Sequence, residues 1–105
     1  SWILKGPQMA LNQSTTKALA LMDVLFNHFA HGLTPTDLAQ ATGMSASDIT
    51  RYVATLEAAG WAERIQETGR IRPSVRVAQK AMAVLRSMDS ARQRLEEIQA
   101  RLATH

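Results

Sequence analysis

Apolar residues recur at helical spacing in the first third of the chain. They form two neighbouring stripes within residues 14–30: Leu19, Met22, Phe26 and Phe29, and beside them Leu21, Val24 and Leu25. Ser14 or Thr15 is placed to cap this predicted helix, and His31-Gly32 to end it. A helix that is apolar over so much of its circumference is expected to be covered on two sides, by its own domain and by another helix or subunit.

Two short helices are predicted next, each opened by a capping signal. In the segment 34–37, Thr-Pro-Thr-Asp supplies a cap, a proline where no amide is needed, and an acidic third position. The segment 45–48, Ser-Ala-Ser-Asp, repeats the pattern. The two helices are expected to end at Gly43 and Gly60. Their apolar positions are Leu38, Ala39 and Ala41 in the first helix and Ile49, Val53 and Leu56 in the second.

The spacing inside this pair of helices is typical of a helix-turn-helix. Ala39 is small enough for two helices to cross closely, and Gly43 can take the left-handed conformation that the turn requires. Ile49 then fills the angle between the helices. The alternative is a helical hairpin that belongs to another small fold.

A β-hairpin is predicted directly after the third helix. Residues 61–67 partly alternate between apolar and polar, Thr68-Gly69 supplies a turn, and residues 70–72 alternate again. Pro73 is expected to prevent further pairing. A helix-turn-helix followed by a hairpin is a winged helix, so the fold class is mainly α with a small β-hairpin and a long C-terminal helix.

The last third of the chain has a heptad pattern. Its apolar positions are separated by alternating intervals of four and three residues: Val77, Ala81, Val84, Met88, Ala91, Leu95, Ile98 and Leu102. This pattern predicts a coiled-coil seam on a helix of about 28 residues, roughly 42 Å long. A helix longer than its domain is expected to need another chain, so we expect a homodimer that also uses Leu21 and Val24 of the first helix. The alternative is that the long helix folds back onto the first helix of its own subunit.

Composition and charge exclude several kinds of site and favour one kind of binding surface. The chain has 105 residues, no cysteine and a net charge of +3. The missing cysteine excludes disulfides, thiolate zinc sites and cysteine nucleophiles, and no apolar run is long enough to span a membrane. Residues 64–80 contain five basic residues against Glu67 alone. This concentration favours a surface that meets phosphate, with a solvated face of an alkaline protein as the alternative.

We divide the chain into three parts. Residues 1–8 are interpreted as an expression leftover or a disordered segment, residues 9–75 as the winged helix-turn-helix domain, and residues 76–105 as a dimerisation helix.

Residues 17–72 resemble the DNA-binding domain of IclR-type transcriptional regulators. The segment 50–61, Thr-Arg-Tyr-Val-Ala-Thr-Leu-Glu-Ala-Ala-Gly-Trp, matches the family's Arg, Thr-Leu and Gly-aromatic pattern. Segments 33–45 and 69–72 resemble its turn and its wing, although Ile71 stands where the family more often has an aromatic residue. MarR-type winged helices are near relatives. The family usually continues into a large ligand-binding domain and shows Leu-Gly after the wing, whereas here Pro73-Ser74 follows and the sequence ends at His105.

The predicted DNA contacts follow from helix-turn-helix geometry, in which the start of the third helix enters the major groove. Arg51 is the best candidate for a base or phosphate contact, because its fork can pair with guanine or bind phosphate. Asp48 is assigned to capping, and Tyr52 either bonds a phosphate or packs beside the wing. The full set is Thr16, Lys17, Ser45, Ala46, Ser47, Thr50, Arg51, Tyr52, Arg70 and Arg72.

The function predicted from these features is a cytoplasmic, nucleoid-associated regulator of bacterial or phage type that binds double-stranded DNA as a homodimer and represses transcription. The rival hypothesis is an interaction module or antirepressor-like adaptor that binds a protein partner. No catalytic motif is present, so we expect no enzyme activity and no cofactor. His28 and His31 are interpreted as a helix-terminal pair rather than as metal ligands.

Overall fold

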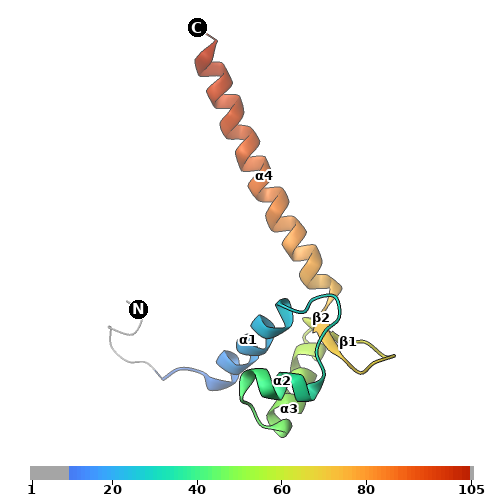
Figure 1. Ribbon diagram of the computed structural model, residues 1–105. Helices are drawn as coiled ribbons and strands as arrows, with labels where there is room; N and C mark the ends of the chain where they lie inside the picture. Colours follow the sequence, from blue (N-terminus) through green and yellow to red (C-terminus); the bar gives the residue numbers. More distant parts are fainter. Residues whose placement is uncertain (1–9, 105) are drawn as a thin grey trace. The chain divides into compact units, whose positions relative to one another are not determined.

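The computed structural model describes residues 10–104, which form two compact units. The first unit ends at Pro73 and the second begins at Ser74 (Figure 1). The prediction that residues 1–8 are an expression leftover lies outside the described residues.

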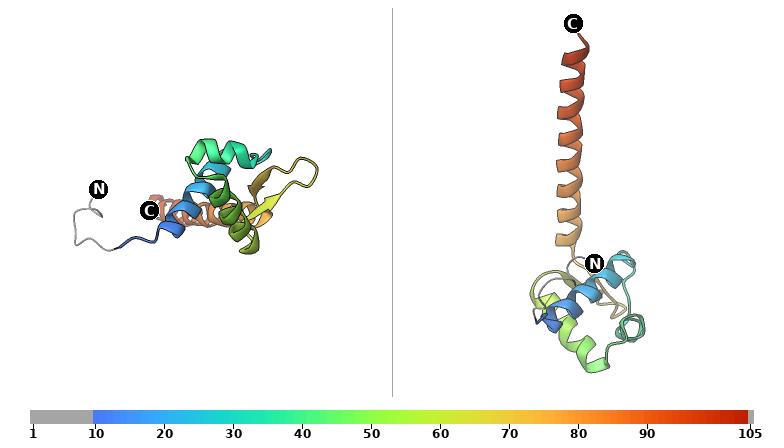
Figure 2. Two further views of the ribbon diagram at one scale, coloured as in Figure 1. Left: turned by 90° about the horizontal axis from the view of Figure 1, so that it is seen from below. Right: turned by 90° about the vertical axis from the view of Figure 1, so that its left-hand side faces the viewer.

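The first unit consists of three helices and a two-stranded hairpin. Its elements are α1 (Gln13–Phe26), α2 (Pro35–Thr42), α3 (Ala46–Ala58), β1 (Ala62–Arg64) and β2 (Ile71–Pro73). In Figure 2 the connection between the two strands extends away from the three helices. This is the predicted mainly helical fold with a small hairpin, and the architecture is that of a winged helix-turn-helix.

Helix α1 differs from its predicted bounds at both ends. Its N-cap is Asn12, whose side chain accepts a hydrogen bond from the backbone N–H of Thr15 at 3.0 Å, so the predicted caps Ser14 and Thr15 are wrong. The helix ends at Phe26 rather than at Ala30. The amide of His28 bonds to the carbonyl three residues earlier, a tighter turn than an α-helix makes, and the chain then leaves the helix axis.

The capping signals of α2 and α3 are confirmed. Thr34 and Asp37 form a complete capping box, in which the Thr34 side chain accepts from the Asp37 amide and the Asp37 carboxylate accepts from the Thr34 amide. Ser45 caps α3 by accepting from the amide of Asp48 at 3.2 Å. Gly43, at φ +74°, ends α2 in the left-handed conformation predicted for the turn.

The hairpin is antiparallel, with Glu63 opposite Arg72 and Arg64 opposite Ile71. Pro73 belongs to β2 and lies opposite Ala62, so pairing ends at Pro73 and not before it. Ile71 also forms an isolated antiparallel bridge with Leu33 through two backbone hydrogen bonds of 2.8 Å. The loop before α2 therefore adds to the far edge of β2, a pairing that no local pattern in the sequence indicates.

The core lies between the three helices and the hairpin. Its fully or nearly fully buried apolar residues are Leu21, Met22, Leu25, Leu33, Leu38, Ile49, Tyr52, Val53, Leu56, Ala62 and Ile71. The inner face predicted for α3 is confirmed. The two predicted stripes do not correspond to two separate faces of α1: Met22 joins Leu21 and Leu25 in the core, whereas Leu19 and Phe26 are exposed. Phe29, which lies beyond the end of α1, is also exposed.

The second unit is a single helix, α4 (Val75–Ala103), of 29 residues. The long C-terminal helix is thus confirmed, and it begins two residues before the predicted seam. At 1.5 Å per residue it extends about 43 Å. Every side chain from residue 79 to residue 104 is exposed in the single chain. Among the described residues, no helix has the length and hydropathy needed to cross a membrane.

Candidate nucleic-acid interface

Helices α2 and α3 form a helix-turn-helix whose second helix presents a polar face. Ile49, Val53 and Leu56 are buried beneath α3, and this fixes the rotation of the helix about its axis. Five of the residues predicted to contact DNA are exposed as a consequence. They are Ser45, Ala46, Ser47, Thr50 and Arg51.

The hydroxyl groups on this face already have partners within the helix. The Thr50 hydroxyl donates to the Ala46 carbonyl at 3.1 Å, and the Ser45 and Ser47 hydroxyl oxygens lie 3.2 Å apart. A hydroxyl that donates in this way keeps acceptor capacity. Arg51 is the one basic residue of α3, and its side chain is 68% exposed.

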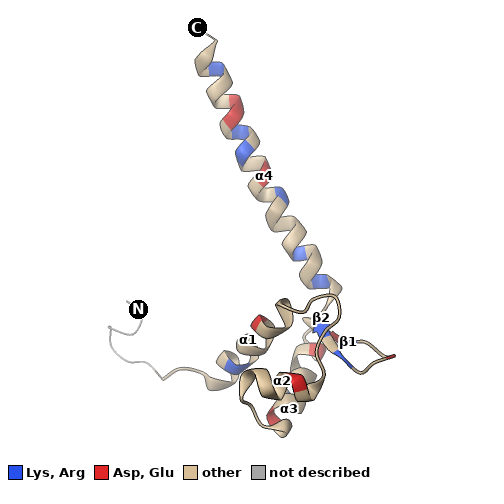
Figure 3. Cartoon of the chain, in the orientation of Figure 1, with Lys and Arg blue, Asp and Glu red and all other residues tan. Residues whose placement is uncertain are grey.

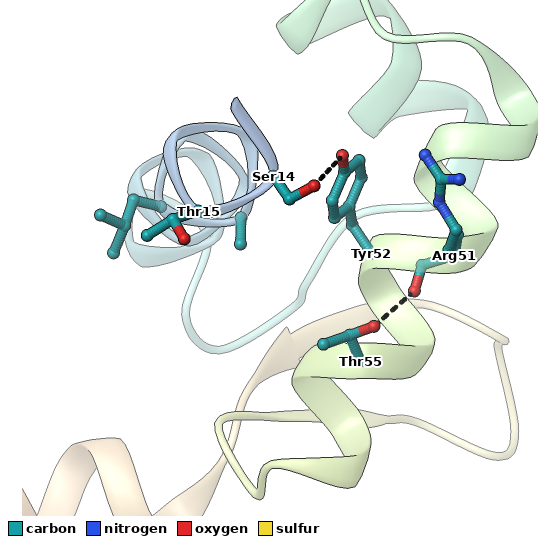
Figure 4. Close-up of a pocket in the computed structure, with 7 residues that line it drawn as sticks. Ser14, Thr15, Arg51, Tyr52 and Thr55 are labelled. Carbon is teal, nitrogen blue, oxygen red and sulfur yellow. Dashed lines mark hydrogen bonds between the residues drawn. The ribbon is translucent and has the colours of Figure 1, made fainter. Parts of the chain in front are cut away.

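Tyr52 is only 7% exposed, so most of its side chain lies in the core rather than on the exposed face of α3. Its hydroxyl donates to the Ser14 hydroxyl oxygen on α1 at 3.4 Å, and the guanidinium carbon of Arg51 lies 5.3 Å from its ring centroid (Figure 4). Stacking of this kind is a cation–π contact. The ring therefore joins α3 to α1 and supports Arg51 from one side.

Asp48 lies within the predicted contact surface and binds two of its cations. One carboxylate oxygen is 3.4 Å from Nζ of Lys17, and the other accepts from Nη2 of Arg51 at 3.0 Å. The sequence pattern assigns Asp48 to capping, but α3 is capped by Ser45 and the Asp48 carboxylate faces the two cations. The i, i+3 spacing of Asp48 and Arg51 on one helix could have predicted their ion pair. The contact with Lys17 could not have been predicted in this way, because Lys17 is 31 residues away in the chain. Thr16, the neighbouring predicted contact, is exposed and donates its hydroxyl to the Asn12 carbonyl.

Arg70 and Arg72 brace the hairpin. Nε of Arg70 donates to the carbonyl of His31 at 3.2 Å, and Arg72 donates to the carbonyl of Ala30 at 3.4 Å. Arg72 also forms an ion pair with Glu63 at 3.1 Å. Both side chains are partly exposed, and any phosphate contact that they make has to compete with these bonds.

The charge distribution in space differs from the one expected from the sequence. Residues 10–73 contain five basic and six acidic residues. Each of the five cations lies within 4.0 Å of a carboxylate: Lys17 and Arg51 of Asp48, Arg64 of Glu57, Arg70 of Asp37 and Arg72 of Glu63. Residues 74–104 contain six basic and three acidic residues, so the positive excess lies on α4 (Figure 3). The basic concentration at residues 64–80 is therefore not an unneutralised patch on the wing.

Several hollows border α1, and two of them are also lined by residues of α3. The first, about 500 Å³, is lined by the hydroxyl-bearing residues Ser14, Thr15 and Thr55, by Arg51 and Tyr52, and by the apolar Ala18 and Leu19 (Figure 4). The second, about 260 Å³, is apolar and lies among Leu19, Met22, Phe26, Leu56 and Trp61, with Asp23 at its margin.

The exposed apolar face of α1 is not the one assigned to the dimer. Leu21 has no exposed surface because it lies in the core of its own unit, and Val24 is half-buried. The prediction that Leu21 contacts a second subunit is therefore wrong. Leu19, at 61% exposed, lies on the accessible face instead.

The capping box of α2 shifts one titration. The side chain of Thr34, and then its backbone, hold the pKa of Asp37 below its ordinary value. Burial opposes this lowering, and the charges of Arg70 and His28 add smaller contributions in the same direction as Thr34. Residues 10–104 contain no group of three or more His, Cys, Asp or Glu side chains arranged to hold a metal ion.

Comparison with known proteins agrees with this geometry. Residues 14–66 match the model of the IclR helix-turn-helix domain. The chain is 31% identical over 81 residues to the HTH-type transcriptional regulator XynR of Escherichia coli strain K12, an alignment that covers 77% of this chain and 32% of XynR.

Solved structures show the same fold. The chain matches Pseudomonas aeruginosa HmgR with a TM-score of 0.65 and 26% identity, over 74% of this chain and 33% of HmgR. An IclR family transcriptional regulator from Brucella abortus, 19% identical, matches with a TM-score of 0.53 over 78% of this chain and 32% of its own, which supports the fold alone. The chain spans about a third of the length of these relatives. The matched segment contains the helix-turn-helix described above, and by this match the chain belongs to the IclR family.

Proposed function

We propose that this chain is a sequence-specific, double-stranded DNA-binding regulator of transcription that acts as a homodimer and represses by occluding a promoter. The observation that carries the proposal is the exposed face of α3. It stands at the position where helix-turn-helix proteins read the major groove, in a chain that belongs to a family of transcriptional regulators.

Arg51 is the central contact in this proposal. A guanidinium fork can form two parallel hydrogen bonds to the O6 and N7 atoms of guanine, which no other base offers in the same arrangement. Ser47 and Thr50 border it, with Ser45 and Ala46 at the leading end of α3. Thr16 and Lys17 at the start of α1 bind the DNA backbone, and Arg70 and Arg72 follow phosphates from the hairpin.

The dimer in this proposal forms through α4. All the predicted seam positions from Ala81 to Leu102 are exposed in the single chain, which leaves an apolar stripe that a second copy would cover. The functional division is then a DNA-binding part, residues 9–75, and a dimerisation part, residues 76–105. Two copies related by a two-fold axis would bind two half-sites of a near-palindrome.

The experiment is selection from random duplexes followed by titration of the selected site at several salt concentrations. We expect an enriched inverted repeat and an affinity that falls steeply with salt, because phosphate contacts release counterions. Arg51→Ala should reduce binding to the selected site at least tenfold and relax one base position in each half-site. Arg86→Ala, an exposed arginine on α4, is the matched control and should leave the base preference unchanged. No binding to any duplex at micromolar concentration and low salt contradicts the proposal.

Two observations favour the rival interaction module. Residues 10–73 carry no excess of positive charge, and the apolar groove beside Trp61 is accessible. An adaptor that binds a protein would tolerate both features. The two functions are separated by Arg51→Ala, because an adaptor that uses the apolar groove keeps its activity when the α3 face loses its only arginine.

A further inference from the structure

Asp48 is a carboxylate within a surface proposed to meet DNA, where its charge repels phosphate. It lies in the first turn of α3, beside residues exposed for base contact, and its side chain is 24% exposed. An acidic side chain in the first turn stabilises a helix. That role requires only a charge near the helix end, and it does not account for the two cations that Asp48 binds.

The two cations come from different helices. Lys17 on α1 reaches one carboxylate oxygen, at 3.4 Å, and Arg51 on α3 donates to the other, at 3.0 Å. Asp48 therefore bonds to both side chains in this arrangement and offsets part of their positive charge.

Arg51 is held from a second direction by Tyr52. The guanidinium carbon lies 5.3 Å from the ring centroid, and the ring is itself buried and bonded through its hydroxyl to Ser14. A guanidinium has five N–H donors, and the bond to Asp48 uses one of them. The side chain is thus oriented while most of its donors remain available, which lowers the entropy cost of forming a two-pronged contact.

Charge removal has its own consequence for binding. Affinity for DNA of any sequence comes mainly from cations that neutralise phosphates, whereas discrimination comes from contacts to base edges. A carboxylate between Lys17 and Arg51 weakens binding to phosphates. The same carboxylate orients Arg51 for a contact with a base edge.

We propose that Asp48 is a positioning residue that sets the sequence discrimination of this protein, by orienting Arg51 toward one base pair and by lowering affinity for non-matching DNA. This inference rests on the proposed function. It makes Asp48 a residue that weakens binding to non-matching DNA and strengthens the preference for the correct site.

The test compares Asp48→Asn with the wild-type chain on a selected site and on a scrambled duplex at several salt concentrations. For Asp48→Asn we expect affinity for the scrambled duplex to rise about threefold or more, since a negative charge near phosphate is lost. The ratio of the two affinities should fall about tenfold, with the preference lost at one base position per half-site. Asp48→Glu, which keeps the charge, should retain more of the ratio than Asp48→Asn.

Asp23→Asn is the matched control, because it removes the same charge from an exposed residue of α1 outside the proposed contact surface. It should change both affinities by the same small factor and leave their ratio unaltered. A folded Asp48→Asn variant with the wild-type ratio overturns the role of Asp48 while the proposed function stands. A wild-type chain that binds no duplex overturns both.

Discussion

Gly32 approaches the carbonyl oxygen of Ile71 so closely that a Cβ atom on Gly32 would lie 2.4 Å from it. Gly32 also has a φ of +70°, and its neighbour Leu33 forms both hydrogen bonds of the bridge to Ile71. The loop between α1 and α2 is therefore pressed against β2 at a point where no side chain fits. Through this contact the hairpin packs against the loop that connects α1 and α2.

We predict that Gly32→Ala destabilises the protein by about 3 kcal/mol or more. A left-handed alanine costs roughly 1–2 kcal/mol, and the clash with β2 must in addition weaken the bridge, at about 1 kcal/mol for each hydrogen bond. The measurement is urea unfolding followed by circular dichroism. The matched control is Gly69→Ala, because Gly69 has a similar φ of +72° but a Cβ atom added to it would have no neighbouring atom within 4 Å. Equal losses in the two variants would contradict the close approach.

A second prediction concerns the two sides of α1. Leu21 is fully buried and Leu19 is 61% exposed, although the two residues are only two positions apart. Leu21→Ala should cost about 2–5 kcal/mol of unfolding free energy, because it leaves a cavity in the core. Leu19→Ala should change it by less than about 0.5 kcal/mol. Thermal unfolding of both variants checks this, and a large loss in Leu19→Ala would show that its face is covered by another chain.

The features predicted correctly from the sequence are those that depend on neighbouring residues. Thr34, Asp37 and Gly43 bond to residues within about one helical turn. Their residue types are therefore enough to predict the capping box and the left-handed end of α2. The apolar spacing places the end of α1 too late, at Ala30 instead of Phe26, since Phe29 continues that spacing after the backbone has left the helix.

The features that the sequence does not predict depend on residues distant along the chain. Leu33 pairs with Ile71 across 38 positions, and Lys17 meets Asp48 across 31. The net charge of a sequence window also fails to predict the charge of the wing surface, because the acidic partners of Arg70 and Arg64 come from α2 and α3. The composition of residues 64–80 gives no information about acidic residues elsewhere in the chain. It therefore predicts a positive charge on the wing that the folded protein neutralises with those acidic residues.

A third prediction concerns acid stability. The pKa of Asp37 is lowered in the folded state by Thr34 first and by Arg70 at longer range. A lowered folded-state pKa means that the unfolded chain binds the proton more readily, so the stabilisation is complete above roughly pH 5 and is lost as the pH falls through the lowered pKa. Asp37→Asn should therefore remove part of the fall in melting temperature below about pH 4.

The matched control for acid stability is Glu67→Gln, a carboxylate in an exposed turn. It should leave the shape of the acid transition unchanged. Thr34→Ala should raise the pKa of Asp37 toward its ordinary value, measured by carbon-detected NMR titration, and should cost about 1 kcal/mol at neutral pH through loss of the cap. An Asp37 pKa that is unaffected by Thr34→Ala would contradict the assigned cause.

The last prediction tests the seam of α4. Leu95 lies on the heptad stripe and Met82 lies off it, and their exposed fractions are similar, 57% and 52%. If two copies pair through the stripe, sedimentation equilibrium gives a mass of twice 11.5 kDa. Leu95→Glu places two carboxylates in the apolar seam and should raise the dissociation constant about 100-fold or more.

Met82→Glu adds the same charge to the same helix outside the seam and should leave the dimer mass unchanged. The comparison with Leu95→Glu therefore distinguishes a charge buried in the seam from a general effect of added charge. Dissociation should also lower the helical signal, because a single exposed helix lacks the tertiary packing that stabilises most helices in proteins. Arg92 bonds to Asp89 and Glu96 on the same helix, so part of that signal will persist in the monomer. A wild-type chain that sediments at 11.5 kDa at about 100 μM would overturn the dimer. Fold-back of α4 onto its own subunit would then be the arrangement to test.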